Sequence, residues 1–296
     1  MSTIEAVQMT EASAPKNTNT ALRRFMSHRL AMFGVVTITF LVLACAFGPM
    51  LLQHSDTQVN ILARFTPPFE NPEYLLGTDQ LGRDILARLL MAGRISLAVG
   101  FGAMLLSMLI GVIIGVVAGY FGGTIGTLLM RFVDAVLCFP TIFLLLALAA
   151  FIKPNITSII FLLAATGWME VARIVEGQMR SLKARDFAVA SLALGAGNTR
   201  IMFKELLPNA VAPIVVAATL SVAHAILMES YISFLGYGIQ PPVPSWGNML
   251  GGAQSYLRNA PWLAILPGLM ITLSVTSINF IGDGLRDALD PRAETV

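Results

Sequence analysis

The sequence predicts an all-α polytopic membrane protein with six transmembrane helices. Of its 296 residues, 56% are hydrophobic and only 12% are charged, and the mean hydropathy is +0.75. This composition is too apolar for a water-soluble globule. Six stretches approach the roughly 20 apolar residues that a spanning helix needs, and no alternating ten-residue pattern indicates a barrel.

The predicted spans are assigned as helices because backbone polar groups cannot stay unpaired in lipid. Pro140 and Pro267 are predicted kink sites in the third and sixth spans. Cys45 and Cys138 fall inside spans and are expected to pack as small apolar residues, with no disulfide and no metal site. The spans cover residues 30–52, 97–120, 133–151, 157–175, 211–232 and 263–281.

The positions of Lys and Arg predict the orientation of these spans. An even number of spans puts both termini on one side, and most of the 19 basic residues lie on that side, which is therefore predicted to be the cytosol. Trp246 and Trp262 fit an aromatic belt at the opposite interface. The residues left on the outer side are Arg64, Arg83, Arg88, Arg94, Lys153 and Arg258.

The cytosolic loop between the fourth and fifth spans, residues 185–210, is basic and helix-forming, yet apolar on every side. Asp186 is predicted as the N-cap of a two-turn helix over residues 187–194, and Gly195 as the residue past its end, where a positive φ costs little. A second short helix is predicted to begin near Asn198.

The first of these helices has two apolar faces. Phe187, Ala190 and Leu194 form one stripe, while Val189 and Leu192 point to the opposite side. The membrane domain can cover only one of them. Leaving a large apolar side chain exposed costs about 1.5–3 kcal/mol, so the other face is expected to dock into a groove of another protein.

The outer loop before the second span contains the segment LLGTDQLGRDILARLLMAGRISL, residues 75–97. Its first half is predicted to turn, as its glycines permit, and its second half to form an amphipathic helix that leads into the second span. Its charged residues are expected to form a local ion-pair and capping cluster. A structural role is favoured over contact with a soluble partner. The candidate residues are Gly77, Thr78, Asp79, Gly82, Arg83 and Asp84.

A second outer element, SFLGYGIQPPVPSWGNML, covers residues 233–250. Its prolines and glycines are predicted to forbid regular helix and to fold the segment against the outer mouth of the bundle. A gate or docking surface, with Pro241, Pro242 and Trp246 as candidates, and a rigid connector remain equal alternatives.

The second span contains three glycines spaced four residues apart, Gly111, Gly115 and Gly119. Such a row of glycines allows another helix to approach closely. Packing within the chain is favoured over a specific dimer seam.

An ion-coupled transporter or channel is one function open to a membrane protein of this kind. It would need ionisable groups inside the membrane, which cost about 2.5–3.5 kcal/mol each at the helix centre. Asp134 and Glu170 each lie one turn from an arginine, Arg131 and Arg173 respectively, and are expected to form interfacial ion pairs. Glu229 and, less strongly, His224 are candidates for the transport pathway, against simple packing or a loop hydrogen bond.

Enzyme chemistry finds no support in the sequence. The three histidines are scattered and lack metal-ligand spacing, and no GxxxxGK[ST] phosphate loop is present. No catalytic residue, no metal site and no ATP-binding site are therefore expected in this chain. The net charge of +2 is explained by membrane orientation and does not favour nucleic acid.

Four blocks carry a family resemblance: GTDQLGRDILARLL followed by GRISL, the cytosolic loop with LGAG and LLPN, SFLGYGIQPPVPSWGNML, and GDGLRDALDPR. In this order they resemble the C-type permease subunit of dipeptide, oligopeptide and nickel ABC importers, members of the binding-protein-dependent transport family. The resemblance implies a type I ABC importer permease fold in a bacterial inner membrane, with both termini cytoplasmic. The cargo it favours is peptide, with nickel chelates, glutathione, sugars or opines as alternatives.

The resemblance also implies partners and regions. The partners are a homologous B-type permease, two ABC ATPase subunits that bind ATP and Mg²⁺, an extracytoplasmic binding protein and lipid; no cofactor is expected in this chain. The implied regions are a disordered cytosolic tail (1–22), the first span with its outer loop (23–93), the importer transmembrane domain (94–284) with its coupling loop (180–209), and a cytosolic C-terminal tail (285–296).

In the family, the cytosolic loop reads E-A-A, three residues, then G, and is a coupling helix seated in a groove of the ATPase. Here the triplet is Val189, Ala190 and Ser191, so the glutamate is absent and docking is expected to depend on packing. The coupling residues implied are Asp186, Phe187, Val189, Ala190, Ser191, Leu194, Gly195, Ala196 and Pro208.

Overall fold

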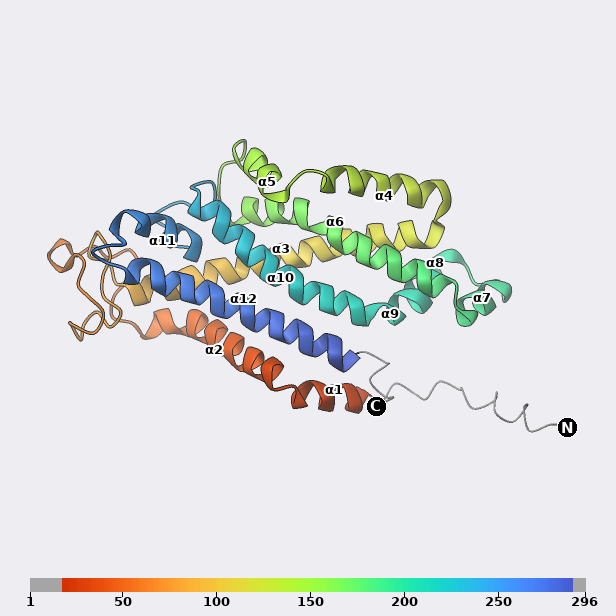
Figure 1. Ribbon diagram of the computed structural model, residues 1–296, viewed down its shortest axis with the longest axis horizontal. Helices are drawn as coiled ribbons and strands as arrows, with labels where there is room; N and C mark the ends of the chain where they lie inside the picture. The colour runs from red at the N-terminus through yellow and green to blue at the C-terminus, as the bar shows by residue number, and fades with distance from the viewer. Residues whose placement is uncertain (1–17, 290–296) are drawn as a thin grey trace.

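A computed structural model describes residues 18–289, and within that part of the chain the regular structure is helical, without a β-strand (Figure 1). The elements that connect the long helices are shorter. Five helices are long and apolar enough to cross a membrane. The long helices are α2 (Arg29–Leu51), α3 (Ile85–Phe121), α6 (Ile156–Lys183), α10 (Val211–Phe234) and α12 (Trp262–Leu289). The others are α1 (Thr18–Ser27), η1 (Ile61–Ala63), α4 (Gly123–Leu137), α5 (Thr141–Ala149), α7 (Asp186–Ala193), α8 (Asn198–Arg200), the π-helical η2 (Ile201–Leu206), α9 (Leu207–Asn209), α11 (Trp246–Ala253) and η3 (Gln254–Tyr256).

Several helices are longer than the apolar stretches that predicted them. The second predicted span began at residue 97, with an amphipathic helix leading into it, and this helix is confirmed: α3 runs without a break from Ile85, where Asp84 caps it by accepting a hydrogen bond from the Leu86 N–H at 2.9 Å. Similarly, α6 continues to Lys183 rather than ending near residue 175. Turns that leave the membrane need no apolar residues, so hydropathy alone does not find them.

The third predicted span, residues 133–151, is wrong as a single helix. The chain instead forms α4 and α5, which are bent by 81° at a break before Pro140. Proline has no N–H to donate and disfavours helical geometry in the preceding residue, so the helix ends there rather than kinks. Cys138, expected to pack in this span, is exposed at the break. Pro267, in contrast, lies inside the continuous helix α12.

The bent pair returns the chain along the length of the bundle. In Figure 1, α4 and α5 run from the end of α3 back to the beginning of α6, so α3 and α6 point the same way. The C-terminal ends of those two helices are joined, because the Lys183 ammonium donates to the Tyr120 carbonyl. With the pair counted as one crossing, the structure has six crossings.

Helices α3 and α6 approach each other closely at the predicted glycines. A Cβ added at Gly115 would lie 2.6 Å from the Ala172 carbonyl oxygen, and one at Gly119 would lie 2.6 Å from that of Glu176. Gly111 faces the Trp168 carbonyl at 2.7 Å in the same way. The prediction that these glycines serve packing within the chain is confirmed.

The predicted disordered tail, residues 1–22, lies partly outside the described residues. From Thr18 onward the prediction is wrong, because residues 18–22 belong to α1. At the other end, residues 285–289 continue α12, and the remainder of the predicted C-terminal tail lies outside the described part.

Candidate functional site

The end of the bundle that is predicted to be cytosolic carries α7, the predicted coupling helix (Figure 1). Asp186 is the first helical residue rather than the N-cap, which is Arg185, so that detail of the prediction is wrong. Gly195 has a φ of +81° as predicted. The Ala196 N–H bonds the Ser191 carbonyl at 3.1 Å and the Gly195 N–H bonds the Leu192 carbonyl at 3.0 Å, which together form a Schellman motif.

The segment after α7 anchors it to the bundle. Ile201, Met202 and Leu206 of η2 are buried in a cluster with side chains from α3 and α6. At its edge, the Tyr120 hydroxyl donates to the Asn198 side chain at 2.8 Å. Pro208 lies in the first turn of α9, and the Asn209 amide donates to the Glu205 carbonyl at 2.7 Å.

The apolar faces of α7 are left uncovered. Ala188 is its one buried residue, so the expectation that the membrane domain would cover the Phe187 stripe or the Val189 side is wrong. Ala190 is also exposed, and Ser191 and Ala196 are half-buried. The exposed fractions of the large apolar residues are 40% for Phe187, 55% for Val189, 56% for Leu192 and 89% for Leu194.

The outer end begins with the charged cluster before α3. The Asp79 carboxylate accepts from the Arg83 guanidinium at 2.7 Å and from the Arg83 N–H at 3.0 Å, and Arg88 lies 3.6 Å away. Gly77 and Gly82 have φ values of +78° and +73°. The predicted ion-pair and capping cluster is therefore present.

The same outer loop is fixed by buried polar groups. Thr78 is fully buried, and its hydroxyl oxygen accepts from the Thr66 N–H at 2.9 Å. Burial raises the pKa of the Asp84 carboxyl above its ordinary value, while hydrogen bonds from the Leu86 and Ala87 backbone oppose this shift. These contacts give the loop a defined structure, and contact with a soluble partner stays a prediction.

The second outer element is partly helical, contrary to the prediction for residues 233–250. Ser245 and Asn248 form a capping box that starts α11, so the prolines and glycines exclude helix only before it. Pro241 and Pro242 are exposed in that preceding stretch. The Asn248 amide donates to the Ile239 and Val243 carbonyls at 3.0 and 2.9 Å, which ties the loop back onto the helix.

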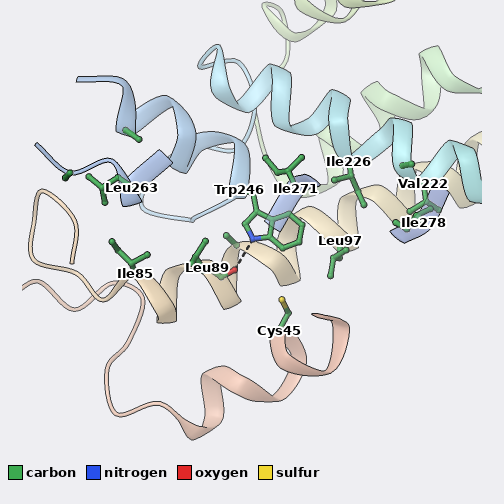
Figure 2. Close-up of a cluster of buried hydrophobic side chains, with 14 residues drawn as sticks. Cys45, Ile85, Leu89, Leu97, Val222, Ile226, Trp246, Leu263, Ile271 and Ile278 are labelled. Atoms are coloured by element: carbon green, nitrogen blue, oxygen red, sulfur yellow. Dashed lines mark hydrogen bonds between the residues drawn. The ribbon is translucent and has the colours of Figure 1, made fainter. Parts of the chain in front are cut away.

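Trp246, the first residue of α11, is not part of an interfacial belt. It is completely buried in the cluster of Figure 2, where its indole N–H donates to the Leu89 carbonyl of α3 at 3.1 Å. Cys45 of α2 and Ile226 of α10 belong to the same cluster. Trp246 thus joins the outer ends of four elements.

Glu229 is also fully buried, on α10 beneath α11. Its carboxylate accepts from the hydroxyls of Ser96 at 2.9 Å and Ser233 at 2.7 Å. The Ser96 oxygen in turn accepts from the Trp246 N–H at 3.3 Å. Glu229 does not line the bundle cavity, and its bonding favours the packing alternative over a place on the pathway.

A cavity of about 330 Å³ is lined by α3, α5, α6, α10 and α12. His224, the other pathway candidate, is exposed and lines this cavity. The remaining polar residues that line it are Ser107, Thr141, Thr166, Glu170, Ser221 and Asn279.

The predicted ion pairs within single helices are wrong. Arg173 of α6 pairs instead with Asp134 of α4, across the two helices. Among the described residues, Glu170 has no cationic side chain within 4.0 Å. Because α6 extends to Lys183, Glu170 lies near the middle of that helix rather than at its cytosolic end.

Known proteins match this chain over nearly its whole length. Residues 111–295 match the family described as the binding-protein-dependent transport system inner membrane component, and residues 18–68 match the N-terminal transmembrane domain of oligopeptide transport permease C. A putative peptide permease protein of Brucella suis is 40% identical over 95% of this chain and 94% of that protein. The chain belongs to the binding-protein-dependent transport system inner membrane component family.

Two further relatives also match nearly the whole chain. The dipeptide transport system permease protein DppC of Alkalihalophilus pseudofirmus is 38% identical over 93% of this chain and 90% of its own. The oligopeptide transport system permease protein OppC of Bacillus subtilis is 38% identical over 92% of this chain and 88% of its own. The chain is thus a multi-pass permease of the inner membrane, and such a permease works with an ATPase and a binding protein.

Sequence reasoning found the cytosolic and outer elements of this permease but missed the cavity. Its lining comes from five helices that are far apart in the sequence. Glu170 was a possible signal, since an ionisable residue within a span is costly. Arg173 lies one turn away on the same helix, so an ion pair with Arg173 was expected for Glu170 instead of a place in the cavity.

Proposed function

We propose that this permease forms half of the translocation pathway of an ABC importer for peptides, with a homologous B-type permease as the other half. The orientation bias of Lys and Arg supports a cytosolic position for both termini and for α7. Peptide cargo is inferred from the relatives, which are named as peptide, dipeptide and oligopeptide permeases.

The observation that carries the proposal is the exposure of both apolar faces of α7. Four large apolar side chains on two helical turns would cost several kcal/mol in water, at about 1.5–3 kcal/mol for each side chain fully transferred. A groove on an ATPase subunit removes that cost. Since Val189 stands where the family has glutamate, this contact is apolar and does not use an ion pair from that position.

The mechanism is alternating access. Two cytosolic ATPase subunits bind ATP and Mg²⁺, approach each other and displace the coupling helices. The bundle responds by turning its cavity toward the outer side, where an extracytoplasmic binding protein docks on the outer loops and releases its cargo. This chain itself holds no cofactor, and alone it has neither ATPase nor transport activity.

The test is the substitution Phe187→Asp, which places a charge in the apolar contact. We expect the purified permease pair to fold but to lose its ATPase subunits in a detergent pull-down, and uptake into liposomes to fall with them. A matched control is Leu62→Asp, because Leu62 is fully exposed on the outer loop and should leave ATPase attachment unchanged. Normal attachment of the ATPases to the Phe187→Asp permease would refute the interface.

A further inference from the structure

The cavity lined by α3, α5, α6, α10 and α12 contains an acidic side chain and no basic side chain of lysine or arginine. Glu170 is its one acidic lining residue, and the lining contains neither lysine nor arginine. His224 is the one other titratable residue that lines it. The cavity therefore presents a carboxylate that no lysine or arginine of its own wall can pair with.

Glu170 has been left without a cation by the geometry of its neighbours. The arginine one turn away, Arg173, is turned to Asp134 on α4. An unpaired ionisable residue within a membrane helix is costly, by about 2.5–3.5 kcal/mol on insertion scales, and such residues face cavities and serve transported ligands. A carboxylate that is exposed to a cavity and is not used for packing is available to bind a cation.

Two hydroxyl groups of the lining can act only as acceptors toward a ligand. The Ser221 hydroxyl donates to the Ala217 carbonyl at 2.8 Å, and the Thr166 hydroxyl donates to the Leu163 carbonyl at 3.1 Å. Their hydrogens are used, so these oxygens can offer only lone pairs to a ligand. Together with the Glu170 carboxylate, they suit a group that only donates, such as an ammonium.

We propose that Glu170 is the cation-binding residue of a cargo site in this cavity, and that it holds a primary ammonium such as the α-amino group of a peptide in transit. The inference rests on the proposed function for its cargo. The volume of about 330 Å³ is at the lower end for small-molecule sites, which run from about 300 to 1,000 Å³, so a short peptide fits better than a long one.

A labelling experiment tests the site without transport. In the complete reconstituted importer, Ser221→Cys is the reporter, with Cys138→Ser added because Cys138 is exposed while Cys45 is buried. The probes are an aminoethyl and a sulfonatoethyl methanethiosulfonate. With Glu170 present we expect the cationic reagent to be favoured about tenfold beyond its intrinsic reactivity ratio, and Glu170→Gln to abolish that preference.

The matched control is Glu176→Gln on the same helix, because Glu176 lies outside the cavity lining and pairs with Arg180 at 3.6 Å. It should keep the preference for the cationic reagent. An unchanged ratio in Glu170→Gln would overturn the assignment, and so would equal reaction of both reagents with the parent protein, which would mean that another subunit neutralises Glu170. Absence of any labelling would show the cavity closed in the complex and would overturn it as well.

Uptake supplies the second readout, with labelled dialanine delivered by the binding protein. We expect Glu170→Gln to lower kcat about tenfold or more, because a charge-assisted hydrogen bond is lost, with the half-saturating concentration of loaded binding protein unchanged. Glu170→Asp should recover most of the rate. Normal uptake by Glu170→Gln refutes the site alone, whereas failure of the unmodified complex to import any peptide with ATP refutes the proposed function.

Discussion

Individual side chains at the outer end combine burial with complete hydrogen bonding. Glu229 has no exposed surface, yet both of its carboxylate oxygens accept hydrogen bonds from serine hydroxyls. Since the Ser96 hydroxyl oxygen also accepts a hydrogen bond from the backbone N–H of Trp246, the network joins α3, α10 and α11. Such a fully satisfied buried network fixes one arrangement of the elements around it.

Replacement of Glu229 by alanine should therefore destabilise the permease. The two serine hydroxyls lose their acceptor and a void remains, so we expect a loss of about 2–4 kcal/mol, seen as a lower thermal unfolding midpoint of the purified complex. The control Glu73→Ala removes an exposed carboxylate that pairs with His54 at 3.5 Å, and should change stability by less than about 1 kcal/mol. Equal midpoints for the two variants would contradict a structural role for Glu229.

Residue identity alone does not decide where an amphipathic side chain lies. Trp246 stands at the predicted boundary of a span, where an indole is at home at the interface. Its burial depends on α11, a short helix whose capping box was hidden among prolines and glycines. Asp79 and Arg83, by comparison, were predictable because their partners lie within four residues along the chain.

At the scale of elements, the contact of α3 with α6 gives the clearest expectation. Gly115→Ala would place a methyl group 2.6 Å from both the Ala172 carbonyl oxygen and the Val175 Cβ, so the helices must separate. We expect the thermal midpoint to fall, by an overpacking cost of about 1–3 kcal/mol. The measurement is the unfolding midpoint in detergent.

Gly177→Ala provides the matched control for that contact, on α6 itself. No atom lies within 4 Å of the added Cβ, and alanine is favoured over glycine in a helix by about 1 kcal/mol. This variant should be as stable as the parent or more so. If both glycine variants shifted the midpoint equally, backbone propensity rather than helix contact would explain the result.

The sequence predicts helices well where apolar runs are long and uninterrupted, as in α2 and α10. It predicted a kink at Pro140, but not that the helix would end there and turn by 81°, because hydropathy continues unbroken through this proline. It also could not say which side of α7 meets the bundle. Ala188 is covered because η2 packs back beneath it, a contact that periodicity within α7 cannot reveal.

For the whole molecule, the distribution of basic residues and six crossings, with the α4–α5 pair counted as one, predict one orientation. In cells whose other exposed cysteine, Cys138, is replaced, Leu62→Cys should react with a membrane-impermeant thiol reagent from outside. Leu194→Cys on α7 should react only after permeabilisation, because both positions are exposed but six crossings place them on opposite sides. Labelling of Leu194→Cys in intact cells would mean that the α4–α5 pair does not cross, or that the orientation is reversed.

The contact between α3 and α6, closed at one end by the Lys183–Tyr120 hydrogen bond, bears on how the subunit would move under the proposed coupling. Three glycines let one helix pack against the backbone of the other, so we expect these two helices to move together. The wall of the cavity that contains Glu170 belongs to this helix pair. The α4–α5 pair is interrupted by an 81° bend, and we expect the subunit to change shape there while the proposed cargo site is preserved.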